Sequence, residues 1–319
     1  MRTPLLRHVA LLALVATAPA ARLCAQTAPL VARADSLLLA GEIVRAEGLY
    51  YVAVRRNTRD PDARLALGGY VGARGGFLPG STLLDEALQF GADTAAVARV
   101  RAPLLQAADA WTQLAALARS PLTAAERERA QWLAAHAPAA SGADSVTVPF
   151  ESSSAAGLGR IQLVVGKDTL AADIDPSVDE IVLGDYTAYA SLVQIFSARE
   201  TDRAAVLVRA SIGDMVLERL PARIDQRLGP ARARIGLALL AKFAPTVDAG
   251  AGVLTLRRSG TVAATLGRRR VPVVFTFPGV RVARPDRLVP IDSPAGRAVL
   301  AQARWTLDLK RGELALEVD

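Results

Sequence analysis

Three aspartates lie within one short stretch of this chain, LAADIDPSVDEIVLG, at residues 170–184. Asp175 follows a short apolar run typical of a strand and precedes the turn-forming pair Pro176 and Ser177, after which a second apolar run begins. A carboxylate at the end of a strand can serve as the acid or base of a hydrolytic site, or it can simply open a turn. Which of the two holds for Asp175 decides whether the protein is an enzyme.

The residue composition excludes two other kinds of hydrolytic site. The chain has two histidines: His8 lies near the start, and His136 lies at the end of an expected helix. A His-based metal site or a serine-histidine triad needs partners that these two residues do not supply. We therefore expect no metal and no cofactor.

The N-terminal segment 1–26 has the order of a secretory signal peptide. Arg2 and Arg7 flank the start of an apolar stretch that is too short to span a bilayer, and small residues follow it. This order predicts a periplasmic or secreted protein from which residues 1–26 are removed. The single cysteine, Cys24, follows an arginine and a leucine where lipoprotein processing requires small residues, so we expect no lipid anchor. We also expect no stable membrane span.

The basic residues do not predict a nucleic-acid partner. The formal net charge is +7, but the arginines are spread along the chain among acidic residues. A run such as residues 268–270 is more typical of a solvated hairpin rim than of a phosphate-binding patch.

Residues 30–138 show helical spacing and an internal repeat. Gly41 aligns with Gly75, and the same offset aligns Ala53 with Ala87. Small residues where two helices touch, with larger apolar residues between them, indicate helix-turn-helix units, and the period resembles that of the tetratricopeptide repeat. The resemblance implies a surface for a peptide or protein partner. The alternative is a helical spacer that packs on the rest of the chain, because each helical pair needs a neighbour to cover its apolar face.

After a small and polar linker at residues 139–145, the periodicity changes from helical to alternating. Short β-like runs, divided by Gly, Pro and Asp turns, predict a closed barrel or a sandwich over residues 146–258. One apolar element, RIGLALLAKF, breaks this pattern and predicts a short helix that begins at Gly236.

The order of these elements resembles that of the retropepsin-like aspartic peptidases, including exported bacterial members that carry tetratricopeptide repeats. Four pieces carry the resemblance: an opening hairpin at VTVPFE and GRIQLVVGKDTLAADID, the turn DIDPSVDEIVL, a hairpin at ASIGDMVLERLPARI, and the helix and strand of ARIGLALLAKFAPTVDAGAGVLTL. It implies that Asp175 stands at the position of the catalytic aspartate. In this family two carboxylates, one from each lobe, share a proton, and one of them deprotonates the attacking water.

The two residues after the aspartate depart from the family's Asp-Thr/Ser-Gly turn. Pro176 supplies neither the hydroxyl nor the N–H of the expected Thr or Ser, and Ser177 adds a Cβ where the family has glycine. Asp173 and Asp179 do not repair the motif. The resemblance also implies a supporting role for Gly236, at the entry of the helix.

The closing helix and strand unit occurs twice in the chain, and one constant offset relates the two copies. Gly236 aligns with Gly296, and the other aligned identities are Leu240 with Leu300, Thr246 with Thr306, Asp248 with Asp308, Gly252 with Gly312, Leu254 with Leu314 and Leu256 with Leu316. Residues 259–319 therefore predict a truncated second lobe that completes the β domain without supplying an acid. Asp292 is expected in a helix-entry turn with Ser293 and Pro294, whereas Asp248 and Asp308 are expected in hairpin turns.

Together these features predict an α+β multidomain protein with N-terminal helical hairpin repeats followed by a mostly-β, retropepsin-like barrel with a partial second lobe. We expect an exported binding or scaffold protein whose peptidase-like domain has lost catalysis. One alternative is an active aspartic endopeptidase that uses Asp175 in a homodimer. Another is a carbohydrate- or envelope-binding barrel.

Overall fold

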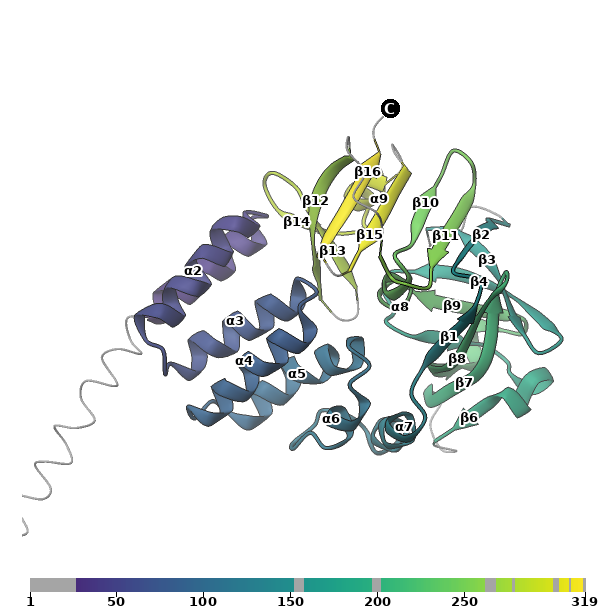
Figure 1. The fold of residues 1–319 in the computed structure, drawn as a ribbon, viewed down its shortest axis with the longest axis horizontal. Coiled ribbons are helices and arrows are strands. Elements are labelled where there is room, and N and C mark those ends of the chain that lie inside the picture. Colours follow the sequence, from purple (N-terminus) through teal and green to yellow (C-terminus); the bar gives the residue numbers. More distant parts are fainter. Residues whose placement is uncertain are drawn as a thin grey trace, which may run out of the picture.

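A computed structural model describes residues 27–151, 158–196, 202–261, 268–276, 279–300, 304–309 and 311–317. Helices form the first part of the chain and strands form most of the second (Figure 1), as expected for an α+β protein. The expected signal peptide, including Cys24, lies outside the described residues. Among the described residues, no helix combines the length and the apolar character needed to cross a membrane.

The N-terminal region consists of consecutive helices whose starts recur at the predicted spacing. A helix that includes residues 27–39 is followed by α2 (Ile43–Arg56), α3 (Pro61–Ala73), α4 (Phe77–Gln89), α5 (Thr94–Ala107), α6 (Trp111–Ala115) and α7 (Ala124–Ala135). The helices α2, α4 and α6 begin at positions 43, 77 and 111, which confirms the offset that separates Gly41 from Gly75. Two of these helices have side-chain caps: Asp60 accepts hydrogen bonds from backbone N–H groups in the first turn of α3, and Thr123 forms a capping box at α7.

The helices pack on the β region of the same chain. Gly41 and Gly75, which are equivalent in the repeat, both have a positive φ, of 78° and 90°. A Cβ at Gly41 would overlap the carbonyl oxygen of Arg284, and a Cβ at Gly75 would overlap that of Leu309. Glycine is therefore required at both turns for conformation and for close approach. Arg74 also donates to backbone carbonyls at the end of the second sheet described below.

Six strands of the β region close into a barrel. They are β3 (Arg160–Val165), β4 (Asp168–Asp175), β5 (Ile181–Leu183), β7 (Asp202–Ile212), β8 (Met215–Asp225) and β9 (Arg232–Gly236). They follow one another in the order β8-β5-β9-β4-β3-β7, and β7 pairs with β8 to close the ring. Residues 170, 172 and 174 of β4 are buried in the barrel core, so the residues between them point outward.

Two further strands extend this sheet, and one of them corrects the sequence analysis. β6 (Val193–Ile195) pairs with β7, and β1 (Ala139–Gly142) pairs with β8. β1 lies in the segment that we expected to be a linker. Small and polar residues suggested an unpaired connection, but here they form an edge strand whose backbone completes hydrogen bonds to β8. Short 3-10 helices occur at Thr187–Leu192, Gln226–Leu228 and Ala241–Phe243.

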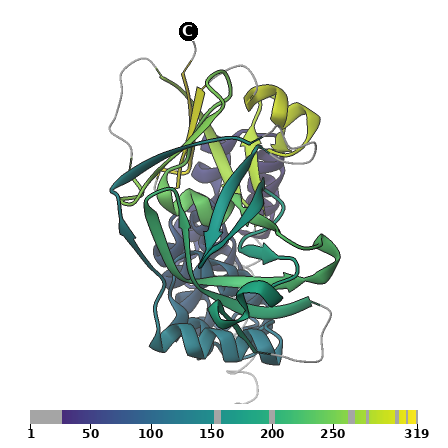
Figure 2. The same ribbon diagram turned by 90° about the vertical axis from the view of Figure 1, so that its right-hand side faces the viewer.

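A second sheet of eight strands has the order β14-β13-β12-β16-β15-β10-β11-β2. Its strands are β2 (Ser145–Pro149), β10 (Thr246–Asp248), β11 (Val253–Arg257), β12 (Arg268–Phe275), β13 (Val280–Ala283), β14 (Leu288–Pro290), β15 (Arg304–Asp308) and β16 (Glu313–Glu317), and the helices α8 (Leu237–Leu240) and α9 (Pro294–Leu300) precede β10 and β15. In Figure 2 the yellow and light green strands of this sheet lie above the teal and green strands of the barrel. The expected boundary at residue 258 does not divide the sheets, because β2, β10 and β11 belong to the second one.

The duplicated units meet each other at the centre of this second sheet. β10 and β15 are antiparallel, with Thr246 opposite Thr306, and the two hydroxyl oxygens lie 2.8 Å apart in a buried hydrogen bond. Because equivalent residues face one another, a local twofold axis relates the two hairpins. The predicted turn aspartates obey the same relation: Asp248 and Asp308 each accept a backbone N–H three residues further on.

Candidate functional site

Asp175 is the last residue of β4, on the outer face of the barrel. β4 pairs with β9 in parallel, and in that register Asp175 lies opposite Gly236. The turn after Asp175 leads into β5, which pairs with β9 in the antiparallel sense. The strands β4, β5 and β9 therefore bring the predicted aspartate turn and the predicted supporting glycine together.

Both carboxylate oxygens of Asp175 have partners within the chain. Oδ1 accepts the backbone N–H of Ser177 at 2.8 Å and the Ser177 hydroxyl at 2.6 Å. Oδ2 lies 3.3 Å from Nη1 of Arg234, and the Asp175 side chain is 17% exposed. An aspartate that binds groups two residues further on forms a turn of the Asx type, and the ion pair to β9 holds its second oxygen.

The ion pair belongs to a ladder of charges across the outer faces of β4 and β9. Asp173 bonds to Arg160 at 2.9 Å and to Arg232 at 3.0 Å. Arg234 pairs with Asp175 and also lies 3.6 Å from Asp225. Opposite charges alternate across neighbouring strands, an arrangement that stabilises the pairing of a sheet.

Gly236 is in close contact with the turn that follows Asp175. A Cβ at Gly236 would lie 2.5 Å from the carbonyl oxygen of Val178 and 2.9 Å from the backbone nitrogen of Glu180. The Gly236 N–H also donates to the Glu180 carbonyl at 3.0 Å. Its φ is −62°, so glycine is needed here for close approach and not for conformation.

A buried ion pair behind the same turn joins the helical region to the barrel, and it was not expected from the sequence. Nη1 of Arg129 in α7 lies 2.6 Å from Oε2 of Glu180, and the two side chains are 4% and 2% exposed. Arg129 also donates to the carbonyl of Ala222 at 2.7 Å, and Arg223 lies 2.9 Å from Oε1 of Glu180. Arg129 shares the buried face of α7 with residues 125 and 133, four positions on either side, and an arginine in such an apolar stripe is a signal of a buried charge but does not identify its partner.

A cavity of about 230 Å³ lies beside this network. Its lining includes residues 177–180 of the turn together with Arg223 and Arg234. Burial raises the pKa of the Asp179 carboxyl, and the neighbouring Glu180 charge raises this pKa further. The lining of the cavity therefore combines carboxylates of the aspartate turn with arginines of β8 and β9.

A turn of the second sheet faces the aspartate turn. It joins β12 to β13 through Thr276 and Gly279, and its sequence is Thr-Phe-Pro-Gly. Gly279 has a φ of 122°, and a Cβ there would lie 3.6 Å from the carbonyl oxygen of Pro176. The two turns therefore meet, but the second one contains no carboxylate that could share a proton with Asp175.

Asp292 lies in the helix-entry turn expected from the sequence. Ser293 caps α9, since its hydroxyl accepts the N–H of Gly296 at 3.1 Å, and Pro294 is the first helical residue. The backbone carbonyl of Asp292 accepts a hydrogen bond from the Nε–H of Arg297, with the two heavy atoms 2.7 Å apart. Across the described residues no group of three or more His, Cys, Asp or Glu side chains is arranged to hold a metal ion.

Comparison with known proteins places the chain in no family. No family model matches the sequence, and no curated protein matches it. Among solved structures, the fold is similar to the crystal structure of a retropepsin-like aspartic protease from Rickettsia conorii. The TM-score is 0.26 at 16% identity, over 38% of this chain and 93% of the other. This similarity is too low to assign an activity.

Proposed function

We propose that this chain is an exported binding or scaffold protein whose aspartic-peptidase-like β region does not hydrolyse peptide bonds. The observation that carries the proposal is the bonding of Asp175. Its two oxygens are held by Ser177 and Arg234, so an attacking water would have to displace the serine hydroxyl or the guanidinium. An aspartate bonded in this way is suited to fixing a turn.

The facing turn supports the same conclusion. Hydrolysis by an aspartic peptidase uses two carboxylates that share one proton, because two like charges so close cannot both ionise. The turn that meets Pro176 is Thr-Phe-Pro-Gly and offers no acid. That turn therefore does not supply Asp175 with the second carboxylate that would protonate the substrate carbonyl.

The duplicated hairpin bears on the alternative of an active homodimer. In that alternative a second chain would supply the second aspartate. Here β10 pairs with β15 of its own chain about a local twofold axis, so this strand edge is already occupied. A homodimer would therefore need another surface, and Asp175 would also have to be released from Arg234.

Cleavage of a broad peptide library between pH 3 and pH 8 tests the loss of catalysis. We expect no cleavage by the unmodified protein, by Asp175→Asn or by the matched control Asp248→Asn, which alters a turn aspartate of the second sheet. Cleavage with an acidic optimum that disappears in Asp175→Asn and persists in Asp248→Asn would overturn the proposal.

The binding role is assigned to the helical region, whose repeated hairpins resemble modules that bind peptides or proteins. Export follows from the N-terminal segment alone and has its own test. Fractionation of cells expressing the full chain should place the protein outside the cytoplasm. N-terminal sequencing should show that the first residues, up to about position 26, are absent. Recovery of the intact chain in the cytoplasm would contradict the proposed export.

A further inference from the structure

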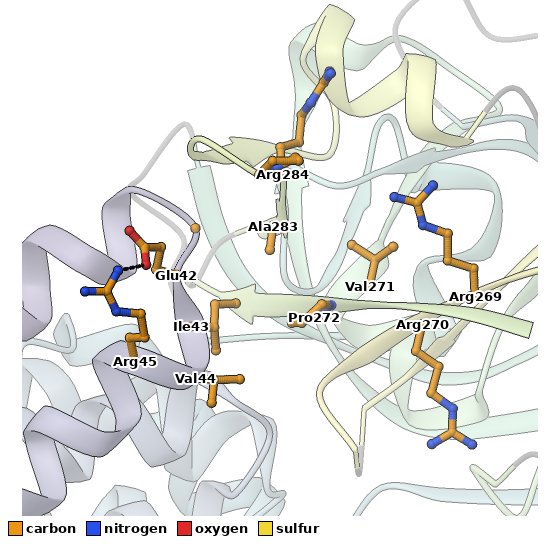
Figure 3. A pocket seen from close by; sticks show the side chains of 12 residues that line it. Glu42, Ile43, Val44, Arg45, Arg269, Arg270, Val271, Pro272, Ala283 and Arg284 are labelled. Carbon is orange, nitrogen blue, oxygen red and sulfur yellow. Dashed lines mark hydrogen bonds and ion pairs between the residues drawn. The ribbon is translucent and has the colours of Figure 1, made fainter.

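We propose that the groove between α2 and the open edge of β12 binds an extended, acidic peptide segment of a partner protein, which adds to the sheet as a strand. This inference rests on the binding role proposed above and gives it a place and a ligand class. The groove lies at the junction of the helical region and the second sheet (Figure 3) and has a volume of about 340 Å³.

The first element of the groove is an open strand edge. β12 spans residues 268–275 and pairs with β16 on one side, but β13 covers only residues 273–275 on the other side. Among the described residues, no strand pairs with residues 268–272 on that second side. At about 3.3 Å per residue, the open edge could pair with a segment of about five residues.

The backbone hydrogen-bonding groups on this edge suit an added strand. The N–H of Val273 donates to Gly312 on the β16 side, so the backbone groups of even-numbered residues point to the open side. Arg270 therefore presents its N–H and its C=O there. Pro272 presents only a C=O, and its missing N–H does not weaken the β16 ladder. Arg268 has the same parity and presents both groups as well, so two donors and three acceptors are available to an extended chain.

The second element is positive charge. Arg45, Arg269, Arg270 and Arg284 line the groove with Glu42, and these five side chains sum to a net charge of +3. Within the described part of the chain, Arg45 pairs with Glu42 and Arg270 pairs with Glu313, whereas Arg269 and Arg284 form no ion pair, so two of the four positive charges are uncompensated. Figure 3 shows these side chains reaching outward from both sides of the groove. A ligand with carboxylates would form ion pairs with the unpaired arginines.

The third element is an apolar floor between the charges. Ile43 and Val271 are buried, at 4% and 8% exposure, whereas Val44 at the rim is 78% exposed. Alternate side chains of a strand point to opposite faces, so one face of an added segment can contact this floor while the other bears carboxylates. The geometry therefore favours alternating acidic and apolar residues over a compact anion.

The test uses the full chain and a fluorescent ten-residue peptide of alternating Glu and Val, with a Lys and Val peptide as its control. Fluorescence anisotropy should show binding of the acidic peptide and not of the basic one. The double variant Arg269→Glu/Arg284→Glu should weaken binding at least tenfold. Arg59→Glu/Arg127→Glu, which reverses two exposed arginines elsewhere, changes the net charge equally and should leave binding within about twofold.

A second pair of variants separates strand addition from charge. Arg270→Ala removes the side chain and keeps the backbone N–H, whereas Arg270→Pro removes both. We expect Arg270→Pro to bind at least fivefold more weakly than Arg270→Ala. The peptide should also slow amide hydrogen exchange in residues 268–272 of the unmodified protein, which tests the backbone contact without any substitution.

Three results would overturn the inference. Absence of binding at millimolar peptide would mean that the arginines and Pro272 only protect the open edge of β12 against aggregation with other strands. Equal binding of inorganic polyphosphate, without protection of residues 268–272, would show a general polyanion site. Binding that survives Arg269→Glu/Arg284→Glu would place the peptide elsewhere. Mass spectrometry of the same peptide distinguishes a failure of the binding proposal from a failure of the proposed function. Cleavage of the peptide would contradict only the proposed loss of catalysis, whereas an intact peptide that does not bind would contradict only the groove proposal.

Discussion

Replacing the buried ion pair between Arg129 and Glu180 should change stability in a strongly non-additive way. Glu180 is 2% exposed and bonds to two arginines, Arg129 at 2.6 Å and Arg223 at 2.9 Å. Removing one partner of a buried pair leaves an uncompensated charge and costs about 3–5 kcal/mol. Replacing both partners by apolar residues of similar volume is often neutral.

The structure ranks the single substitutions. Glu180→Leu removes the carboxylate bonded to Arg129, which is 4% exposed, and keeps its hydrogen bond to the Ala222 carbonyl, so we expect a loss of about 4 kcal/mol in the free energy of unfolding. Arg129→Met leaves Glu180 with Arg223, so the loss should be nearer to about 3 kcal/mol. In the double variant Arg223, which is 39% exposed, can turn to water. The double loss should therefore stay below about 2 kcal/mol.

Urea denaturation at pH 7 measures all four free energies of unfolding. A coupling energy of several kcal/mol between the two sites is the expected result. Single losses below about 1 kcal/mol, or single losses that simply add, would show that the pair does not carry the contact between α7 and the barrel. The surface pair Arg209 and Glu218, 63% and 28% exposed, is the control and should couple by less than about 1 kcal/mol.

Three further predictions concern the glycine turns, the aspartate turn and the twofold axis. Gly75→Ala should lower the free energy of unfolding by more than about 1 kcal/mol, because the added Cβ would overlap a carbonyl oxygen of the second sheet. Gly48 lies in open space on α2, so the control Gly48→Ala should raise the free energy of unfolding by about 0.5–1 kcal/mol in the same urea assay. The raised pKa of Asp179 means that the folded state holds its proton more tightly, so stability falls as pH rises from about 4 through the folded pKa. Asp179→Asn should therefore stabilise the protein more at pH 7 than at pH 3, and an equal effect at both values would contradict this cause. Thr246→Val should cost about 1 kcal/mol more than Thr306→Val, because the hydroxyl of Thr246 also accepts from an arginine at 2.7 Å; equal losses on thermal or urea unfolding would refute the difference.

Features that depend on local sequence could be predicted. The positions of Gly41 and Gly75 indicated the helix spacing, because a turn needs glycine where φ is positive. The constant offset between the two closing units indicated two copies of one hairpin, although only the structure shows that Thr246 faces Thr306. The turn after Asp175 could be predicted because Pro176 and Ser177 are turn-forming residues.

Features that depend on long-range pairing could not be predicted. Arg234 reaches Asp175 across 59 residues only because β4 and β9 are parallel neighbours. Arg129 and Glu180 are 51 residues apart, on a helix and a turn that no periodicity connects. The segment 139–142 forms a strand because β8 offers it an edge, and its own residues carry no strand signal.

The pairing of Thr246 with Thr306, its equivalent in the duplicated hairpin, has a consequence during protein synthesis. β15 is made only after β11 to β14 and α9, so the edge of β10 that pairs with β15 has no partner strand until β15 has been synthesised. A strand that meets its own duplicate about a twofold axis can meet the same strand of another molecule in the same way. Neighbouring nascent chains, or chains cut before β12, would then pair through β10, with Thr246 opposite Thr246. The duplicated hairpin supplies, within the same polypeptide, the partner strand that this edge of β10 would otherwise lack.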